Sequence, residues 1–257
     1  MNRNPEIQKA FEIADDSLQG VLGYHFYVTA MKKSVDVRKL SEYLPDNVIP
    51  HTFSWHRYYQ KQDLTGTFES IFESYQSRIS LVAMVNVFEV ALKKLIRYLD
   101  RSGHPQTLNG RKLDGDENYK THIQWAYLEA RKCDIGDKDA ISRLPKTFGK
   151  IDNARRLRNL IVHNHGLFNQ RYKTDAIEYK DIEIELHPDY AAFENSPQVP
   201  SPIGLTTDNI VDFSKSHVEV LHVLHNGVQK NFFGFPDAYN YGQEQKLIEW
   251  EKVLLGT

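Results

Sequence analysis

The stretch RRLRNLIVHNHG, residues 155–166, combines a helical apolar pattern with arginines at its start and histidines at its end. Within it, Arg158 stands five positions before His163. Arginine carries a permanent charge on a planar fork that binds phosphate oxygens, whereas histidine as a residue type gains and loses protons near neutral pH. The stretch therefore pairs a group that holds anions with a group that moves protons.

This stretch is predicted to end a helix that runs from about Lys146 to His163. Apolar residues recur at helical spacing along the segment, namely Phe148, Ile151, Ala154, Leu157, Leu160 and Ile161. Gly166 tolerates the left-handed backbone that ends many helices, so we expect His163 in the last turn. Five positions correspond to about 140° on an ideal helix, so Arg158 and His163 do not share one face.

The segments on either side also show helical patterns. The expected helices are Thr67 to Arg101, Glu117 to about Lys132, a short helix from Asp137 to Leu144 that ends before Pro145, and Asp208 to about Phe232 with Thr206 or Thr207 as its cap. Between Glu178 and Leu186, the alternation of Ile182, Ile184 and Leu186 with glutamates predicts a short amphipathic strand. The fold class expected is therefore mostly α with one short β element.

The two ends of the chain give weaker patterns. Expected short elements are a helix over Pro5 to Leu18, a strand or buried helix over Tyr24 to Met31, a helix over Val37 to Leu44, and a final helix from about Gln243 to Leu255. We therefore divide the chain into three parts. These are a partly helical N-terminal extension (1–66), a helical bundle (67–232) and a C-terminal helix that packs on the bundle (233–257).

The residues Arg158-Asn159-x-x-x-His163, within this order of helices, resemble the Arg-x(4–6)-His motif of the HEPN superfamily (higher eukaryotes and prokaryotes nucleotide-binding domains). The resemblance covers roughly residues 67–232. It implies an up-and-down helical bundle that dimerises so that two motifs face each other. It also implies a metal-independent ribonuclease of the kind found in bacterial toxin–antitoxin and antiphage systems.

The resemblance assigns roles to the residues of the motif. His163 would act as general base or acid on the RNA, and Arg158 would hold the phosphate, leaving 2′,3′-cyclic phosphate and 5′-hydroxyl ends. Asn159 would orient His163 or contact a phosphate, and Asn164 and His165 would line the pocket. His165 also satisfies the family spacing and is the alternative catalytic histidine. A surface ion pair for Arg158 and a helix-end cation for His163 are the structural alternatives.

RNA affinity would require a local basic patch, because 32 Lys and Arg against 34 Asp and Glu give a formal net charge of -2. Such a patch is present, since Lys146, Lys150, Arg155 and Arg156 precede the motif and Arg171 and Lys173 follow it. Of these, Lys150, Arg155 and Arg156 are the expected RNA contacts. A solvated helix face is the alternative for these charges.

Two polar residues, Asn86 and Glu89, lie three positions apart in the apolar middle of the long helix expected over 67–101. Unpaired polar groups are costly inside a protein. Either Glu89 pairs with Arg158 from a neighbouring helix, or both residues lie on a solvent-facing edge.

Several classes of protein and site are excluded. A single cysteine, Cys133, rules out an intrachain disulfide and a cysteine-based zinc site. The spacing of His217, His222 and His225 lacks the carboxylate of a zinc motif, so these are expected in the core or at a dimer face, with no metal or cofactor. No run of about 18 apolar residues and no signal segment occurs, so a cytoplasmic location is expected.

The partners expected are RNA, a second copy of the chain and an antitoxin or defence-system protein. The main alternative function is a non-catalytic HEPN-like module for binding or assembly. A helical scaffold with a coincidental motif is a third hypothesis, and a motif that faces the core would favour it.

Overall fold

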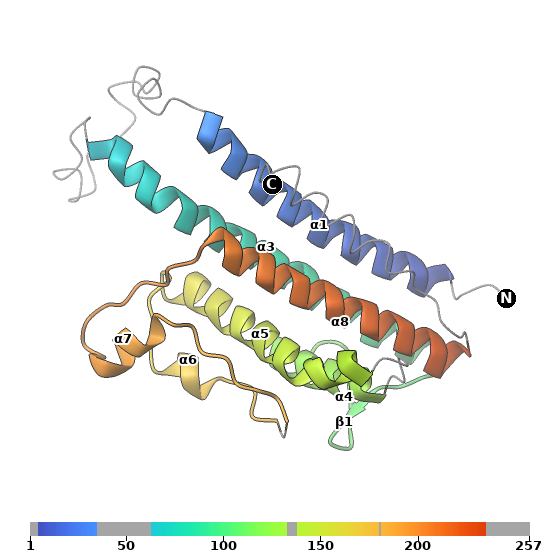
Figure 1. The fold of residues 1–257 in the computed structure, drawn as a ribbon. Helices are drawn as coiled ribbons and strands as arrows, with labels where there is room; N and C mark the ends of the chain where they lie inside the picture. Colours follow the sequence, from blue (N-terminus) through green and yellow to red (C-terminus); the bar gives the residue numbers. More distant parts are fainter. Residues whose placement is uncertain (1–4, 35–62, 133–137, 180, 235–257) are drawn as a thin grey trace.

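The structure is a computed structural model and describes residues 5–34, 63–132, 138–179 and 181–234. Four long helices make up most of this part of the chain (Figure 1): α1 (Pro5–Ser34), α3 (Asp63–Arg101), α5 (Lys138–His163) and α8 (Thr207–Phe233). The shorter helices are α4 (Tyr119–Lys132), α6 (Arg171–Thr174) and α7 (Tyr190–Asn195). The prediction of a mostly α bundle is confirmed. The helices expected over 37–44 and 243–255 lie outside the described residues.

The long helices alternate in direction, since residue numbers rise along one helix as they fall along its neighbour. Between α1 and α3 the contacts are His25–Ser80 and Lys32–Phe72. The end of α5 meets α3 through Arg158–Asn86 and Gly166–Arg78. Helices α5 and α8 meet through Thr147–Glu219 and Lys150–Asp212. The bundle is therefore of the up-and-down type.

Helix α1 shares the core of the bundle, although residues 1–66 were expected to form an extension. It packs on α3 and α8 with a buried face of Ile7, Phe11, Ala14, Leu18, Leu22 and Phe26. The segment from Tyr24 to Met31 is part of this helix, which settles the choice between strand and helix.

Residues 138–163 form one helix, so the predicted break before Pro145 is wrong. Proline removes one backbone donor and crowds the carbonyl four residues before it, here that of Ile141 in the first turn. Pro145 is the eighth residue of α5, so one bond to the first turn is lost while the residues that follow keep their donors. Leu144 before the proline and Phe148 after it are fully buried and hold the helix in place. The Pro145 carbonyl accepts a hydrogen bond from Glu183 N–H at 3.3 Å.

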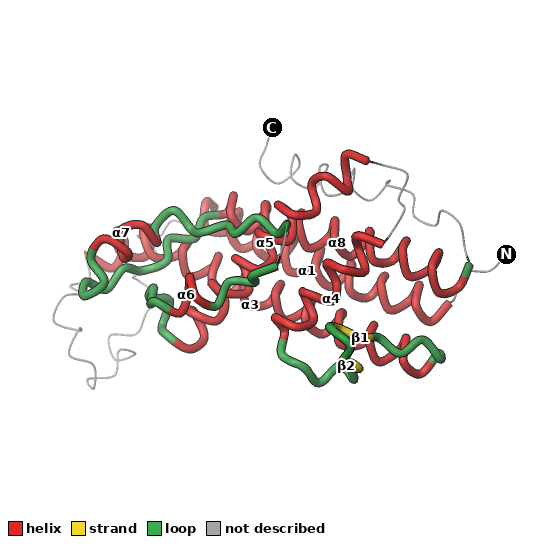
Figure 2. The backbone as a smooth tube through the Cα atoms, turned by 90° about the horizontal axis from the view of Figure 1, so that it is seen from below, coloured by secondary structure: helices red, strands yellow, loops and turns green. Residues whose placement is uncertain are grey.

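The strand predicted between Glu178 and Leu186 is absent from the described chain, and this prediction is wrong. Its backbone groups bind α5 rather than another strand: Glu183 N–H donates to Pro145, and the Glu185 carbonyl accepts from Arg156 Nη2 at 2.7 Å. The β element instead pairs Thr107–Leu108 (β1) with Arg111–Lys112 (β2), antiparallel (Figure 2). Asn109 and Gly110 between them both have positive φ, as tight hairpin turns require.

The last long helix begins at the predicted cap. The Thr206 side chain accepts from Asn209 N–H at 3.4 Å, and the Asn209 side chain accepts from Thr206 N–H at 3.0 Å. This reciprocal pair satisfies backbone donors that the helix leaves unpaired at its start. Of the two expected caps, Thr206 is confirmed.

Candidate functional site

The motif lies at the C-terminal end of α5, near α6 and α7 at one end of the bundle (Figure 1). Arg158 and Asn159 are half-buried, and His163 and His165 are exposed. His163 is the last residue of α5, while His165 and Gly166 have φ angles of 53° and 73°. The chain has therefore left the helix at His165, as the position of Gly166 predicted.

Arg158 is oriented by α3 and by its own neighbour in the sequence. Its Nη2 donates to Asn86 Oδ1 at 2.9 Å and lies 3.9 Å from Glu89 Oε2, while its Nη1 donates to Asn159 Oδ1 at 3.0 Å. The pairing of Glu89 with Arg158 is therefore confirmed. The alternative, a solvent-facing edge, holds for Asn86, which is exposed, while Glu89 is half-buried. The guanidinium is held at the surface rather than in the core.

An open hollow of about 770 Å³ lies against the end of α5. Its lining side chains are mostly polar: Asn159, His163 and Asn164 from the motif, and Asn169, Arg171, Thr174 and Asp175 from the segment around α6, with Arg156, Leu160 and Tyr172 completing it. Arg158 is not among them. The structure thus brings three motif residues together in one hollow and places Arg158 beside it, joined through Asn159.

Arg155 and Arg156 are only 4% and 2% exposed, which contradicts their prediction as RNA contacts. Both bind Asp152, with Nε–carboxylate distances of 3.0 Å. Arg155 also binds the side chain and carbonyl of Asp175, each at 2.5 Å. These arginines position the segment that follows the motif, because a buried charge is tolerated only when it is paired.

Arg156 completes this buried cluster. Its Nη1 and Nη2 donate to the carbonyls of Tyr172 and Glu185 at 2.9 and 2.7 Å. Burial raises the pKa of Tyr172 to about 12, so its hydroxyl stays protonated and donates to Asn153 Oδ1 at 2.5 Å. Arg156 and Tyr172 line the hollow, but their polar atoms form these hydrogen bonds within the protein.

Lys150 is also paired within the protein. Its Nζ lies 2.5 Å from Asp212 Oδ1 on α8. Lys150 does not line the hollow and has a partner on a different helix, so it does not join a basic patch with the motif. Of the three predicted RNA contacts, Arg155 and Arg156 are buried and Lys150 lies outside the hollow.

Sequence reasoning missed the residues that build the far wall of the hollow, Asn169, Thr174 and Asp175. It also missed Asp152, although a readable signal was present: Asp152 precedes Arg155 and Arg156 by three and four positions, the spacing at which helical side chains meet. No sequence pattern marks the far wall, because α6 has only four residues.

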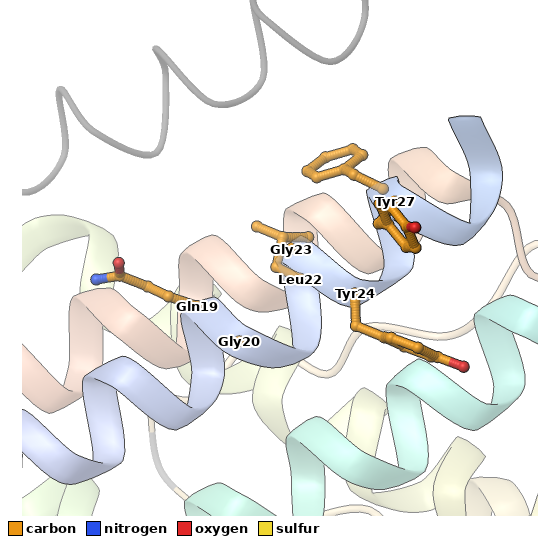
Figure 3. Close-up of a pocket in the computed structure, with 7 residues that line it drawn as sticks. Gln19, Gly20, Leu22, Gly23, Tyr24 and Tyr27 are labelled. Atoms are coloured by element: carbon orange, nitrogen blue, oxygen red, sulfur yellow. The ribbon is translucent and has the colours of Figure 1, made fainter. Parts of the chain in front are cut away.

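A second hollow, of about 520 Å³, lies along α1 and is largely apolar (Figure 3). Tyr24 and Tyr27 flank it and are 59% and 60% exposed. Among the described residues that line it there is no histidine, arginine or lysine. The hollow at the end of α5 is therefore the better candidate for acid–base chemistry.

Neither a family model, nor a curated protein, nor a solved structure matches this chain. Within the described ranges, no helix is both long and apolar enough to cross a membrane. The same ranges hold no group of three or more His, Cys, Asp or Glu side chains arranged to bind a metal ion. His217 and His225 are fully buried, as expected for core histidines.

Proposed function

We propose that this chain is a HEPN-type RNA endonuclease that needs no metal ion, with His163 as the proton-transfer group and Arg158 as the phosphate-binding group. The observation that carries the proposal is the placement of an exposed His163 in an open polar hollow, with Arg158 held at its margin by Asn159. A motif that faced the core would have favoured a scaffold instead. The helix order and the up-and-down bundle also support the proposal.

The proposed reaction is an attack by the ribose 2′-oxygen on the adjacent phosphorus, with release of the 5′-oxygen of the next nucleotide. His163 takes the 2′-hydroxyl proton or supplies a proton to the leaving oxygen. Arg158 neutralises the charge that builds on the non-bridging oxygens. The products are a 2′,3′-cyclic phosphate and a 5′-hydroxyl.

Two copies of the chain would supply the complete site. Arg158 contacts α3, whereas His163 lines the hollow on the α6 side of the same helix end. A two-fold interface along the end of α5 would bring Arg158 of one copy toward His163 of the other. We include this homodimer in the proposal, together with a role as a toxin or antiphage effector under the control of a partner protein.

A non-catalytic binding module is the second candidate. It is favoured by the contacts of Arg158, whose guanidinium already donates to Asn86 and Asn159 and lies near Glu89. An arginine held in this way can bind a partner surface without stabilising a reacting phosphate.

The deciding experiment is to incubate the purified full-length chain with single-stranded RNA in excess EDTA. We expect cleavage, with cyclic phosphate ends on the fragments. His163→Ala protein purified in parallel controls for contaminating ribonuclease. Cleavage that EDTA abolishes and a divalent ion restores would exclude the proposed mechanism, and RNA binding without cleavage would favour the binding module.

A further inference from the structure

Arg171 is a basic side chain on the hollow that has no role in the motif. It is the first residue of α6 and is exposed, and no ion pair joins it to any residue of the described ranges. The other basic side chains near it are paired: Arg155 and Arg156 with Asp152, and Lys173 with Glu194 at 2.6 Å. Arg171 therefore offers its guanidinium to a ligand in the hollow.

The acidic residue in the hollow does not oppose an anionic ligand strongly. Asp175 Oδ2 lies 2.5 Å from Arg155 Nη1, and Asp175 Oδ1 lies 3.8 Å from Lys120 Nζ. Its charge is thus offset by two cations. Arg171 then remains the permanent charge in the hollow without an internal counter-charge.

Three asparagines supply uncharged donors and acceptors. Asn159 and Asn169 use their side-chain oxygens to accept from Arg158 and from Tyr172 N–H, which leaves their NH₂ groups for a ligand. Asn164 uses its NH₂ group to donate to the Leu167 carbonyl, which leaves its oxygen as an acceptor. Such a mixture of donors and acceptors complements the edge of a nucleobase.

The size and rigidity of the hollow also suit a nucleotide. Its volume of about 770 Å³ lies within the range of roughly 300–1,000 Å³ typical of small-molecule sites. The buried contacts of Arg155 and Arg156 fix the wall that carries Arg171 against α5. An arginine in such a wall can bind a phosphate with two hydrogen bonds or stack on a base.

We propose that this hollow holds one nucleotide of single-stranded RNA next to the bond that is cut, with Arg171 binding its phosphate and Asn159, Asn164 and Asn169 contacting its base. The identity of the ligand rests on the proposed function. The hollow also contains His163, and the proposal adds Arg171 and Asn169 to the residues that contact RNA.

The test compares Arg171→Ala with Lys173→Ala. Both variants remove one exposed positive charge from α6, but Lys173 does not line the hollow. The probe is a fluorescent single-stranded DNA oligomer in EDTA, which carries phosphates and bases but lacks the 2′-hydroxyl and is not cut. We expect Arg171→Ala to weaken binding about 10-fold and to lower the slope of log Kd against log salt by about 0.7. Lys173→Ala should change binding less than about 2-fold.

Equal effects of the two variants, or none from Arg171→Ala, would overturn the site. The same variants are then assayed for RNA cleavage, so that the two proposals fail separately. Cleavage by wild type with unchanged binding in Arg171→Ala would reject the nucleotide site and leave the nuclease proposal standing. Binding that depends on Arg171, with no cleavage of any RNA, would reject the nuclease and support the nucleotide site.

Discussion

Asn159 accepts a hydrogen bond from Arg158 Nη1 at 3.0 Å and also lines the hollow that contains His163. One side chain therefore touches the group that would bind phosphate and borders the space in which RNA would lie. The amide fixes the direction of the guanidinium from within the same helix. Substitutions at Arg158 and His163 can therefore separate phosphate binding from proton transfer.

Replacing His163 with alanine should lower RNA cleavage by about 100-fold or more, because the proton-transfer group is lost. RNA binding should remain close to wild type. Arg158→Ala should reduce both binding and cleavage, since the arginine acts on the phosphate before and during attack. Single-turnover rates and anisotropy titrations measure the two effects.

His165→Ala is the internal control for this comparison, because His165 is exposed, lies beyond the end of α5 and does not line the hollow. Its effect should be milder. An inactive His165→Ala with a normal His163→Ala would transfer the catalytic role to His165, and wild-type rates in all three variants would end the nuclease hypothesis.

Mixing the two inactive variants tests whether the site is built from two copies. If Arg158 of one copy works with His163 of the other, a heterodimer of Arg158→Ala and His163→Ala contains one intact site. Random reassembly should then restore about a quarter of wild-type cleavage. Each variant refolded alone is the control. Persistent inactivity of the mixture, or full activity of a monomeric wild type, would contradict a shared site.

Asp152 should be the residue on which the wall of the hollow most depends. It accepts hydrogen bonds from Arg155 Nε, Arg156 Nε and the N–H of Ile177. Asp152→Ala leaves two buried guanidinium groups without their carboxylate and should cost about 3–5 kcal/mol of unfolding free energy.

The matched control for Asp152 is Glu194→Ala, which breaks the exposed pair with Lys173 and should leave the urea midpoint nearly unchanged. Urea denaturation followed by circular dichroism measures both variants. Similar midpoints for the two would show that the buried cluster does not stabilise the fold.

Gly149 is required by close packing rather than by backbone conformation. A Cβ atom added there would lie 1.9 Å from the Glu183 carbonyl oxygen, so Gly149→Ala must displace the segment after α6. We expect a loss of roughly 1–3 kcal/mol. Gly23→Ala on α1 meets no atom within 4 Å and should stabilise the helix by about 0.5–1 kcal/mol. Thermal melts of the two variants should therefore shift in opposite directions.

Acid should destabilise the bundle through its core histidines. Burial lowers the pKa of His217 to about 4, and that ring packs edge-on against Phe88 at 4.8 Å. Because the unfolded chain binds the proton more tightly, His217 contributes its full stability above pH 6.5 and loses it as the pH falls toward 4. Between pH 7 and pH 5 we expect a loss of about 2 kcal/mol from this residue.

Urea midpoints measured across this pH range test the prediction, with His217→Gln as the comparison. The variant should show a flatter pH dependence than wild type. His222, whose pKa burial also lowers to about 4, should leave a residual slope in the variant. Parallel curves for wild type and His217→Gln would contradict the role of His217.

Periodicity predicted α3, α4 and α8, most of α5 and part of α1, because each of these helices buries one face. The stripe around Phe148 and Leu157 and the one around Phe88 and Leu92 are visible in the chain and fully buried in the bundle. The break expected at Pro145 failed because tertiary packing outweighs one missing hydrogen bond inside the helix.

The site was predicted only in part. The motif on α5 could be read because Arg158, Asn159 and His163 are close in the sequence. Charge alone could not distinguish a surface arginine from Arg155 or Arg156, since burial depends on where Asp175 and the Tyr172 carbonyl lie in space. The far wall of the hollow, Asn169, Thr174 and Asp175, could not be predicted either, because short loops have no periodic sequence pattern.

The hydrogen bond from Ile177 N–H to Asp152 Oδ2, at 3.1 Å, ties the backbone after α6 to the buried carboxylate. This amide can exchange with solvent only when the carboxylate releases it, so its protection reports on the ionic cluster rather than on apolar packing. The order of α6 depends on the same cluster, because Arg156 binds the Tyr172 carbonyl and Arg155 binds the Asp175 carboxylate. Loss of the ionic cluster would then loosen the wall of the hollow by a local opening, independent of the global unfolding of the bundle.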